Sequence, residues 1–148
     1  MSSFKYYSAP GFGQVTREQY GFSDACVIGN RIEVTGQVGF HPDTLEVPSN
    51  LEAEVAQAFD NLNTVILHII KESGVGKPVD ETRAWDNVVK ITSYHVGLSQ
   101  KRAELREIMV KALKERFRNH QPLFTMVGVE SLPLEETNVE VEAVVYVN

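Results

Sequence analysis

Apolar side chains recur at intervals of three and four along residues 51–73, and this spacing constrains the fold more than any other feature of the chain. They are Leu51, Val55, Ala58, Phe59, Leu62, Val65, Ile66, Ile69 and Ile70. Such spacing predicts one long helix with a single broad buried stripe. Ser49 and Glu52 predict a capping box at its start, and Gly74 and Gly76 predict its end.

Alternating and β-branched segments predict five strands around this helix. We expect them at residues 25–28, 31–38, 85–96, 124–129 and 139–147. A second amphipathic helix, capped by Ser99, is expected to run to about Arg118. The order β-β-α-β-α-β-β indicates an α+β fold, with two helices packed on one face of a mixed sheet. We expect residues 1–148 to form a single domain, in which residues 1–24 are an extended lead-in.

The last strand has two different faces. Its odd-numbered positions carry Val139, Val141, Ala143, Val145 and Val147, whereas Glu140, Glu142, Val144 and Tyr146 share the other face. Two helices cover only one side of a sheet, and the second face is partly apolar. We therefore expect another subunit to cover that second face.

Composition and charge limit the function classes. A chain of 148 residues with 43% hydrophobic and 23% charged residues suits one globular domain. The net charge of -6 argues against nucleic acid as a partner, because nucleic-acid binders need a basic surface to neutralise phosphates. One cysteine, Cys26, permits no intrachain disulfide, and no segment has the apolar length of a signal peptide or a membrane span. These features predict a cytoplasmic protein with no membrane partner.

The histidines and short motifs give no sign of a metal or a cofactor. Histidines lie far apart at positions 41, 68, 95 and 120, and metal-binding, nucleotide-binding and nucleophile-elbow motifs are absent from the sequence. We therefore expect neither group. His95, at the end of a central strand, is interpreted as a core or edge histidine, with a proton-transfer group as the alternative.

Several short motifs follow one another through the chain. They include Thr35-Gly36-Gln37-Val38-Gly39, Val88-Val89-Lys90-Ile91-Thr92, Pro122, Val127-Gly128-Val129, Leu132-Pro133 and Val139-Glu140-Val141-Glu142-Ala143. In order and spacing these motifs resemble the RidA/YjgF family of reactive-intermediate deaminases, formerly labelled L-PSP endoribonucleases. The resemblance covers about residues 22–147.

The resemblance implies a chorismate-mutase-like fold and a homotrimer with three clefts between subunits. Typical members hydrolyse reactive enamines or imines, released by pyridoxal-phosphate enzymes, to ketoacids and ammonia, and they need no cofactor. The family's cleft tyrosine falls on Phe22, and its hydroxyl residue before Gly-Gln is kept as Thr35. An asparagine of the second helix falls near Val110. The carboxylate-binding arginine falls on Phe124, and the glutamate thought to handle a water or a proton is kept as Glu142.

Replacement of the arginine by Phe124 changes the expected ligand, because an Arg–carboxylate pair gives directional anion recognition and a phenyl ring gives none. We expect an apolar or aromatic small molecule in the cleft. The expected ligand contacts are Phe22, Phe40, Phe124 and Met126 as an apolar wall, with Thr35, Gln37, His120 and Glu142 as polar contacts. Two alternatives stay open: Phe124 fills the cleft as packing, and Glu142 is an exposed or salt-bridged strand carboxylate.

Three functions are compatible with these residues. The first is hydrolysis or tautomerisation of a small reactive imine, enamine or related carbonyl compound, with Glu142 as the catalytic residue and Thr35 orienting the substrate. The alternative is a non-catalytic binding protein for an apolar metabolite. An endoribonuclease is the least favoured, because the chain is acidic and lacks a basic aromatic surface.

Overall fold

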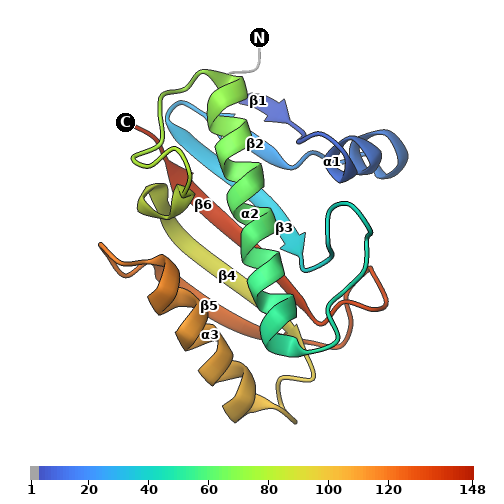
Figure 1. Cartoon of the computed structure of the whole chain (residues 1–148). Coiled ribbons are helices and arrows are strands. Elements are labelled where there is room, and N and C mark those ends of the chain that lie inside the picture. Colours follow the sequence, from blue (N-terminus) through green and yellow to red (C-terminus); the bar gives the residue numbers. More distant parts are fainter. Residues whose placement is uncertain (1–3) are drawn as a thin grey trace.

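The computed structural model describes residues 4–148, which form one six-stranded mixed sheet with helices packed on it (Figure 1). The strands are β1 (Phe4–Tyr7), β2 (Ala25–Ile28), β3 (Arg31–Val38), β4 (Val88–Val96), β5 (Leu123–Val129) and β6 (Val139–Tyr146). The α-helices are α1 (Phe12–Val15), α2 (Leu51–Ser73) and α3 (Arg102–Arg116). The α+β class predicted from the sequence is confirmed.

The strand order across the sheet is β1-β2-β3-β6-β4-β5. Neighbouring strands are antiparallel except β4 and β5, which are parallel and are connected through α3. The pairing of β3 with β6 shifts register between Val34 and Gln37, which marks a bulge or irregularity beside Thr35 and Gly36. This irregular stretch lies at the site described below.

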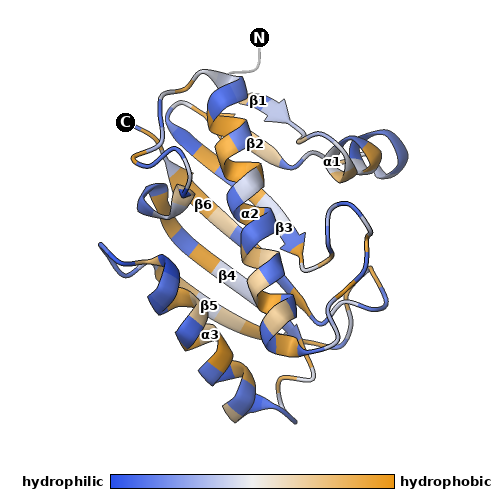
Figure 2. Cartoon of the chain, viewed as in Figure 1, coloured by the Kyte–Doolittle hydropathy of each residue, from blue (hydrophilic) through white to orange (hydrophobic). Residues whose placement is uncertain are grey.

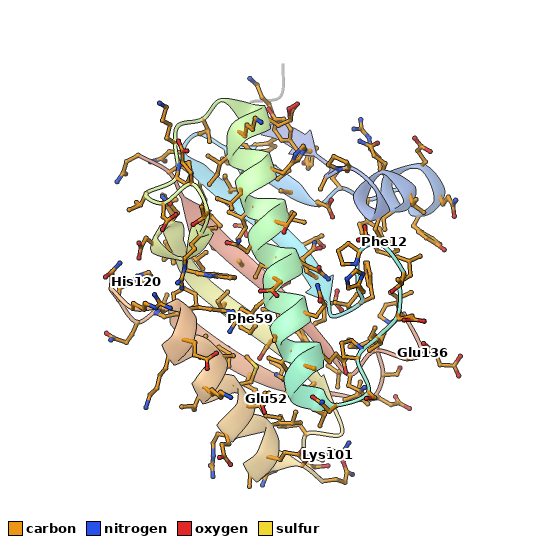
Figure 3. The ribbon with its side chains drawn as sticks, viewed as in Figure 1. Phe12, Glu52, Phe59, Lys101, His120 and Glu136 are labelled. Atoms are coloured by element: carbon orange, nitrogen blue, oxygen red, sulfur yellow. The ribbon has the colours of Figure 1, made fainter. Side chains whose placement is uncertain are left out.

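The stripe along residues 51–73 packs on the sheet as predicted, and α2 and α3 cover the same sheet face (Figure 1). Apolar and polar bands alternate along α2 in Figure 2. Phe59, labelled in Figure 3, is fully buried. Its ring lies 5.7 Å from that of Trp85, and the Arg116 guanidinium lies 4.8 Å from the centroid of the Phe59 ring. Burying a side chain of this size contributes roughly 1.5–3 kcal/mol, so the stripe is a main source of stability.

The start of α2 differs by one residue from the prediction. Asn50, not Ser49, is the N-cap: its backbone is extended, and its Oδ1 accepts a hydrogen bond from the Ala53 amide at 2.8 Å. Asparagine caps helices as well as serine does, so the local signal was ambiguous between neighbours. Gly74 ends the helix in the left-handed conformation, with φ of 64°.

The lead-in is not extended throughout. Residues 1–3 lie outside the described part of the chain, but Phe4–Tyr7 pairs with β2 as an edge strand, so the sheet gains a sixth strand. After it come α1 and a π-helix at Thr16–Tyr20. π-helical turns are rare overall and are frequent at functional sites.

Two other boundaries need correction. Residues 84–87 form a 3₁₀ turn before β4, because Asn87 bonds the Val79 amide at 2.9 Å and the Tyr146 carbonyl at 3.0 Å through its side chain. The second helix begins at Arg102 and ends at Arg116, and its N-cap is Lys101, which makes no side-chain capping bond. Ser99 lies in the preceding turn.

The second sheet face has no helix of residues 4–148 packed across it. In β6 the odd-numbered residues from Val139 to Val145 are buried under the helices, as predicted. Glu140, Glu142 and Val144 are half-buried on the other side, and Tyr146 is exposed. We call this side the open face.

Candidate functional site

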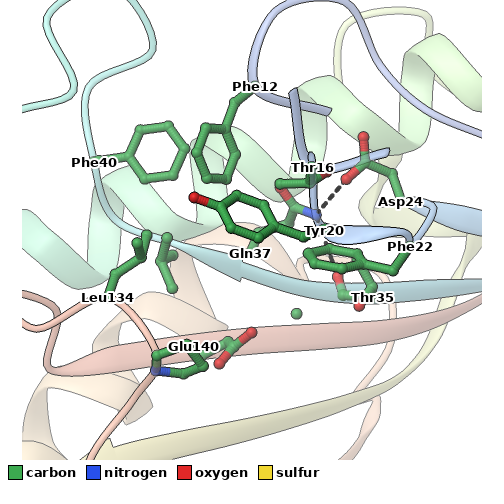
Figure 4. Close-up of a pocket in the computed structure, with 13 residues that line it drawn as sticks. Phe12, Thr16, Tyr20, Phe22, Asp24, Thr35, Gln37, Phe40, Leu134 and Glu140 are labelled. Atoms are coloured by element: carbon green, nitrogen blue, oxygen red, sulfur yellow. Dashed lines mark hydrogen bonds between the residues drawn. The ribbon is translucent and has the colours of Figure 1, made fainter. Parts of the chain in front are cut away.

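A pocket with a volume of about 280 Å³ lies where β3 and β6 meet the helical part of the lead-in (Figure 4). Four aromatic rings, from Phe12, Tyr20, Phe22 and Phe40, line it. Its polar side chains belong to Thr16, Asp24, Thr35, Gln37 and Glu140, and Gly36, Val38, Pro133 and Leu134 complete the lining. We call this the aromatic pocket.

The helical lead-in supplies much of the aromatic lining. Phe12 of α1 packs edge-on against Phe40, with ring centroids 4.5 Å apart. Tyr20, at the end of the π-helix, is 67% exposed, and Phe22 is 47% exposed. Exposed aromatic rings around a hollow are unusual unless a ligand or another chain covers them.

Asp24 fixes the polar side of the pocket. One carboxylate oxygen accepts the Ala9 amide at 2.8 Å, and the other accepts the Gln37 side-chain amide at 3.4 Å. Gln37 also donates to the Thr35 carbonyl at 3.3 Å. Asp24 is 5% exposed, so its charge is committed to holding the lead-in against β3.

Glu140 is the other carboxylate of the pocket. Its side chain lies over Gly36, and a Cβ at that position would stand only 2.6 Å from the Glu140 Cδ. Glycine is therefore required at position 36 for the carboxylate to occupy this place. No donor among residues 4–148 forms a hydrogen bond to it. Burial, and secondarily the negative charge of Glu142, raise the pKa of Glu140.

Four of the predicted ligand contacts come together in this pocket. Phe22, Thr35, Gln37 and Phe40 all line it. The carboxylate beside them is Glu140, which shares a strand face with Glu142 but is two residues nearer the start of β6.

Glu142 lies farther along the open face, outside the aromatic pocket. It accepts a hydrogen bond from the Tyr94 hydroxyl at 2.7 Å, and this bond raises the pKa of Tyr94. It lines a shallow, polar depression together with Arg31, Glu33 and Lys90. Within one chain, Glu142 and the predicted aromatic contacts therefore do not form one site.

Phe124 and Met126 lie on the helix side of the sheet. In the parallel pairing of β4 with β5 they stand opposite Ile91 and Ser93, which are both buried under the helices. Phe124 is 36% exposed, and Met126 packs against the core. The two side chains thus point away from the face that carries Glu142, and they lie outside the aromatic pocket of their own chain.

His120 and His95 both make contacts within the fold and lie outside the aromatic pocket. The Nε2 of His120 lies 2.8 Å from the Val88 carbonyl, and its ring stands edge-on to Phe117. His95 is fully buried, its Nε2 is 2.8 Å from the Ser93 hydroxyl, and burial lowers its pKa to about 4. His95 is therefore a neutral core histidine at physiological pH.

Sequence reasoning missed Phe12, Tyr20, Asp24 and Glu140. The first three belong to a lead-in that was interpreted as extended, and their convergence depends on its helical turns. The alternation of β6 did place Glu140 and Glu142 on one face, but it does not show that the side chain of Glu140, and not that of Glu142, lies over Gly36. In the described ranges, no group of three potential metal ligands lies close together, and no helix is long and apolar enough to cross a membrane.

The fold and the pocket define a small α+β protein whose open sheet face carries an aromatic pocket with a carboxylate in it. Comparison with known families agrees: the sequence model of the Endoribonuclease L-PSP family matches residues 15–147. The chain belongs to this family, which confirms the resemblance to RidA and YjgF.

Individual relatives are distant in sequence. The chain is 29% identical over 124 residues to a RutC family protein of Aquifex aeolicus, covering 83% of this chain and 87% of that protein. It is 27% identical over 121 residues to Protein MMF1, mitochondrial, of Saccharomyces cerevisiae, and the match covers 82% of this chain and 70% of that protein. Since that relative is described as mitochondrial, the cytoplasmic location stays a prediction.

A solved structure of RidA from an Antarctic Psychrobacter species matches the fold. It has a TM-score of 0.65 and 26% sequence identity, and the match covers 99% of this chain and 97% of that one. Family and fold are thus established together.

Proposed function

We propose that this protein hydrolyses a small imine or enamine that carries no carboxylate, in the aromatic pocket, with Glu140 as the acid and base. The observation that carries the proposal is the Glu140 carboxylate, which is half-buried beside four aromatic rings and has no hydrogen-bond donor within residues 4–148. A carboxyl group with a raised pKa is suited to moving protons near neutral pH.

The reaction divides into two proton transfers. Glu140 first accepts a proton from water while the water oxygen bonds to the imine carbon and the C=N electron pair moves to nitrogen. The carboxyl group returns this proton to nitrogen, which completes the first transfer and gives a carbinolamine. In the second transfer Glu140 takes the proton of the carbinolamine hydroxyl and delivers it to nitrogen, while the C–N bond breaks and the oxygen forms the C=O bond. One imine and one water are consumed, and one carbonyl compound and one ammonia are released. General acid–base catalysis of this kind typically contributes a factor of about 10² to 10⁴.

The other pocket residues have supporting roles in this proposal. Thr35 offers a hydroxyl beside Glu140 to orient the nitrogen or the water. The apolar rings exclude bulk water and hold the substrate body. These protein groups supply the whole sequence of steps, so we propose that no cofactor takes part.

We further propose a homotrimer with a ligand cleft at each subunit interface. The open face, with Val144 and Tyr146, is the surface that another subunit would cover. Phe124 of a neighbouring subunit, which is 36% exposed, would then complete the apolar wall, whereas Met126 packs against the core of its own chain. Light scattering should give a mass of about 50 kDa, three times the chain mass of 16.6 kDa. A mass of one chain would rule out the shared cleft.

The proposed activity is tested with imines made in situ. A flavin amine oxidase acting on phenethylamine gives an imine without a carboxylate, and an amino-acid oxidase acting on phenylalanine gives its carboxylate-bearing counterpart. We expect the protein to accelerate ammonia release from the first more than from the second. No acceleration over the oxidase alone for either imine would contradict the proposal.

A second candidate function is non-catalytic binding of an apolar metabolite, favoured by the exposed rings of Tyr20 and Phe22. It predicts saturable binding with no acceleration in the same assay. Ribonuclease activity has less support, because the two carboxylates that line the pocket, Asp24 and Glu140, repel phosphate.

A further inference from the structure

The charged side chains that line the aromatic pocket are all negative. The described lining residues include two carboxylates, Asp24 and Glu140, and neither a lysine, an arginine nor a histidine. The Asp24 carboxylate accepts hydrogen bonds from the Ala9 amide and the Gln37 side chain, whereas Glu140 has no such donor among residues 4–148. An anion that entered would lose its hydration without gaining a partner, so the pocket disfavours carboxylates.

The rings add a second attraction for positive charge. Phe12, Tyr20, Phe22 and Phe40 stand on one side of the pocket, and the Glu140 carboxylate faces them from the other side (Figure 4). The face of an aromatic ring attracts a cation through its quadrupole, and the attraction grows as water is excluded. Several rings opposite one carboxylate form an arrangement that suits an ammonium group with an apolar body.

The glycine below the carboxylate shows that this arrangement is built into the backbone. Glu140 occupies the space above Gly36 that any larger residue would fill. Its nearest ionised neighbour along β6 is Glu142, another acid, so β6 itself brings no positive charge to the site.

We propose that the aromatic pocket selects cationic ligands, namely alkylammonium ions and protonated imines with an apolar body, and rejects carboxylates of the same shape. This inference rests on the proposed function in that it names the substrate class of the same pocket. A protonated imine is also the form that water attacks most readily. The reaction that supplies such a substrate is then the oxidation of a primary amine, rather than a reaction of an amino acid.

Calorimetric titration with three ligands of matched shape tests the proposal: benzylammonium, benzyl alcohol and benzoate. We expect benzylammonium to bind at least tenfold more tightly than benzyl alcohol, and benzoate to bind most weakly. Glu140→Gln should remove the preference for benzylammonium over benzyl alcohol, and binding of benzyl alcohol shows that the variant is folded. Glu72→Gln removes the same charge from the exposed surface of α2, away from the pocket and from the open face, so it should retain the preference.

Benzoate binding as tightly as benzylammonium would overturn the proposal, and so would an unchanged preference in Glu140→Gln. The measurement uses binding alone, so it is independent of turnover. A cation preference without imine hydrolysis would support this inference and contradict the proposed function. Imine hydrolysis without a cation preference would support the proposed function and contradict this inference.

Discussion

The Glu140 carboxylate lies over Gly36 of the neighbouring strand, so closely that a Cβ on residue 36 would stand 2.6 Å from the Glu140 Cδ. This contact places an acid in the aromatic pocket without a hydrogen-bond donor from residues 4–148. The shift in the pairing of β3 with β6 between Val34 and Gln37 lies at the same place, so the backbone irregularity and the Glu140 carboxylate are next to each other.

Gly36→Ala should push the carboxylate out of its position. Forcing a methyl group into a packed site costs roughly 1–3 kcal/mol of unfolding free energy, and we expect imine turnover to fall at the same time. The measurement is chemical denaturation together with the ammonia assay. In the double variant Gly36→Ala, Glu140→Ala the stability cost should largely disappear, because the methyl group no longer meets the carboxylate. Additive losses would show that the two residues are independent.

Phe124→Arg should alter the ligand range if a neighbouring subunit contributes this residue to the pocket. We expect weaker binding of benzyl alcohol and stronger binding of benzoate, since a guanidinium pairs with a carboxylate. Calorimetry measures both affinities. Val79→Arg is the matched control, because Val79 is 69% exposed in the loop between α2 and β4, outside the pocket and the open face. Unchanged affinities in Phe124→Arg would remove Phe124 from the site.

Lowering the pH should destabilise the protein through His95. The unfolded chain binds a proton at this histidine below about pH 6.5, whereas the folded protein does so only near its pKa of about 4. The free energy of unfolding should therefore fall between pH 6.5 and 4, by up to about 3 kcal/mol from this residue. In His95→Leu the free energy of unfolding should no longer show this decrease between pH 6.5 and 4, even if the variant is more or less stable at every pH. The exposed His41 is the control: an equal change in the profile of His41→Gln would contradict the prediction.

Glu54 should be essential for joining α2 to β6. It is 1% exposed and accepts the backbone amides of Asn138 at 2.5 Å and Val139 at 3.2 Å, and the Asn138 side chain at 3.0 Å. Glu54→Ala removes the acceptor for all three donors, and we expect a loss of at least about 3 kcal/mol by denaturant unfolding. Glu52→Ala, on the same helix turn, removes only an exposed pair with Lys111 and should cost much less. Similar losses in both variants would contradict this account.

The long-range features of the fold were predictable where periodicity is strong. The spacing of three and four in α2 and the alternation in β6 each define a buried face over many residues. β1 was missed because it has only four residues, three of them exposed, and it depends on pairing with β2. The cap of α2 shifted by one residue, from Ser49 to Asn50, because serine and asparagine are equivalent caps in sequence terms. The cap of α3 shifted by two residues, from Ser99 to Lys101.

The site was predictable only in part for a different reason. Thr35, Gln37 and Phe40 come together because they lie on β3 or directly after it, so a local segment is enough to relate them. Phe22 precedes β2 and joins them through the hairpin of β2 and β3. The choice between Glu140 and Glu142 depends on the register of β6 against β3, which alternation alone does not give. Tyr20 and Phe12 reach the pocket through a π-helix and a short α-helix that carry little sequence periodicity.

The assignment of the acid is tested most directly by comparing Glu140→Gln with Glu142→Gln in the imine assay. Glutamine preserves the shape of each side chain and removes its ability to move a proton. We expect the rate of ammonia release in Glu140→Gln to fall by a factor of about 10² or more, and that in Glu142→Gln to stay within a few-fold of the unmodified protein. The opposite order, or equal rates in both variants, would contradict the account.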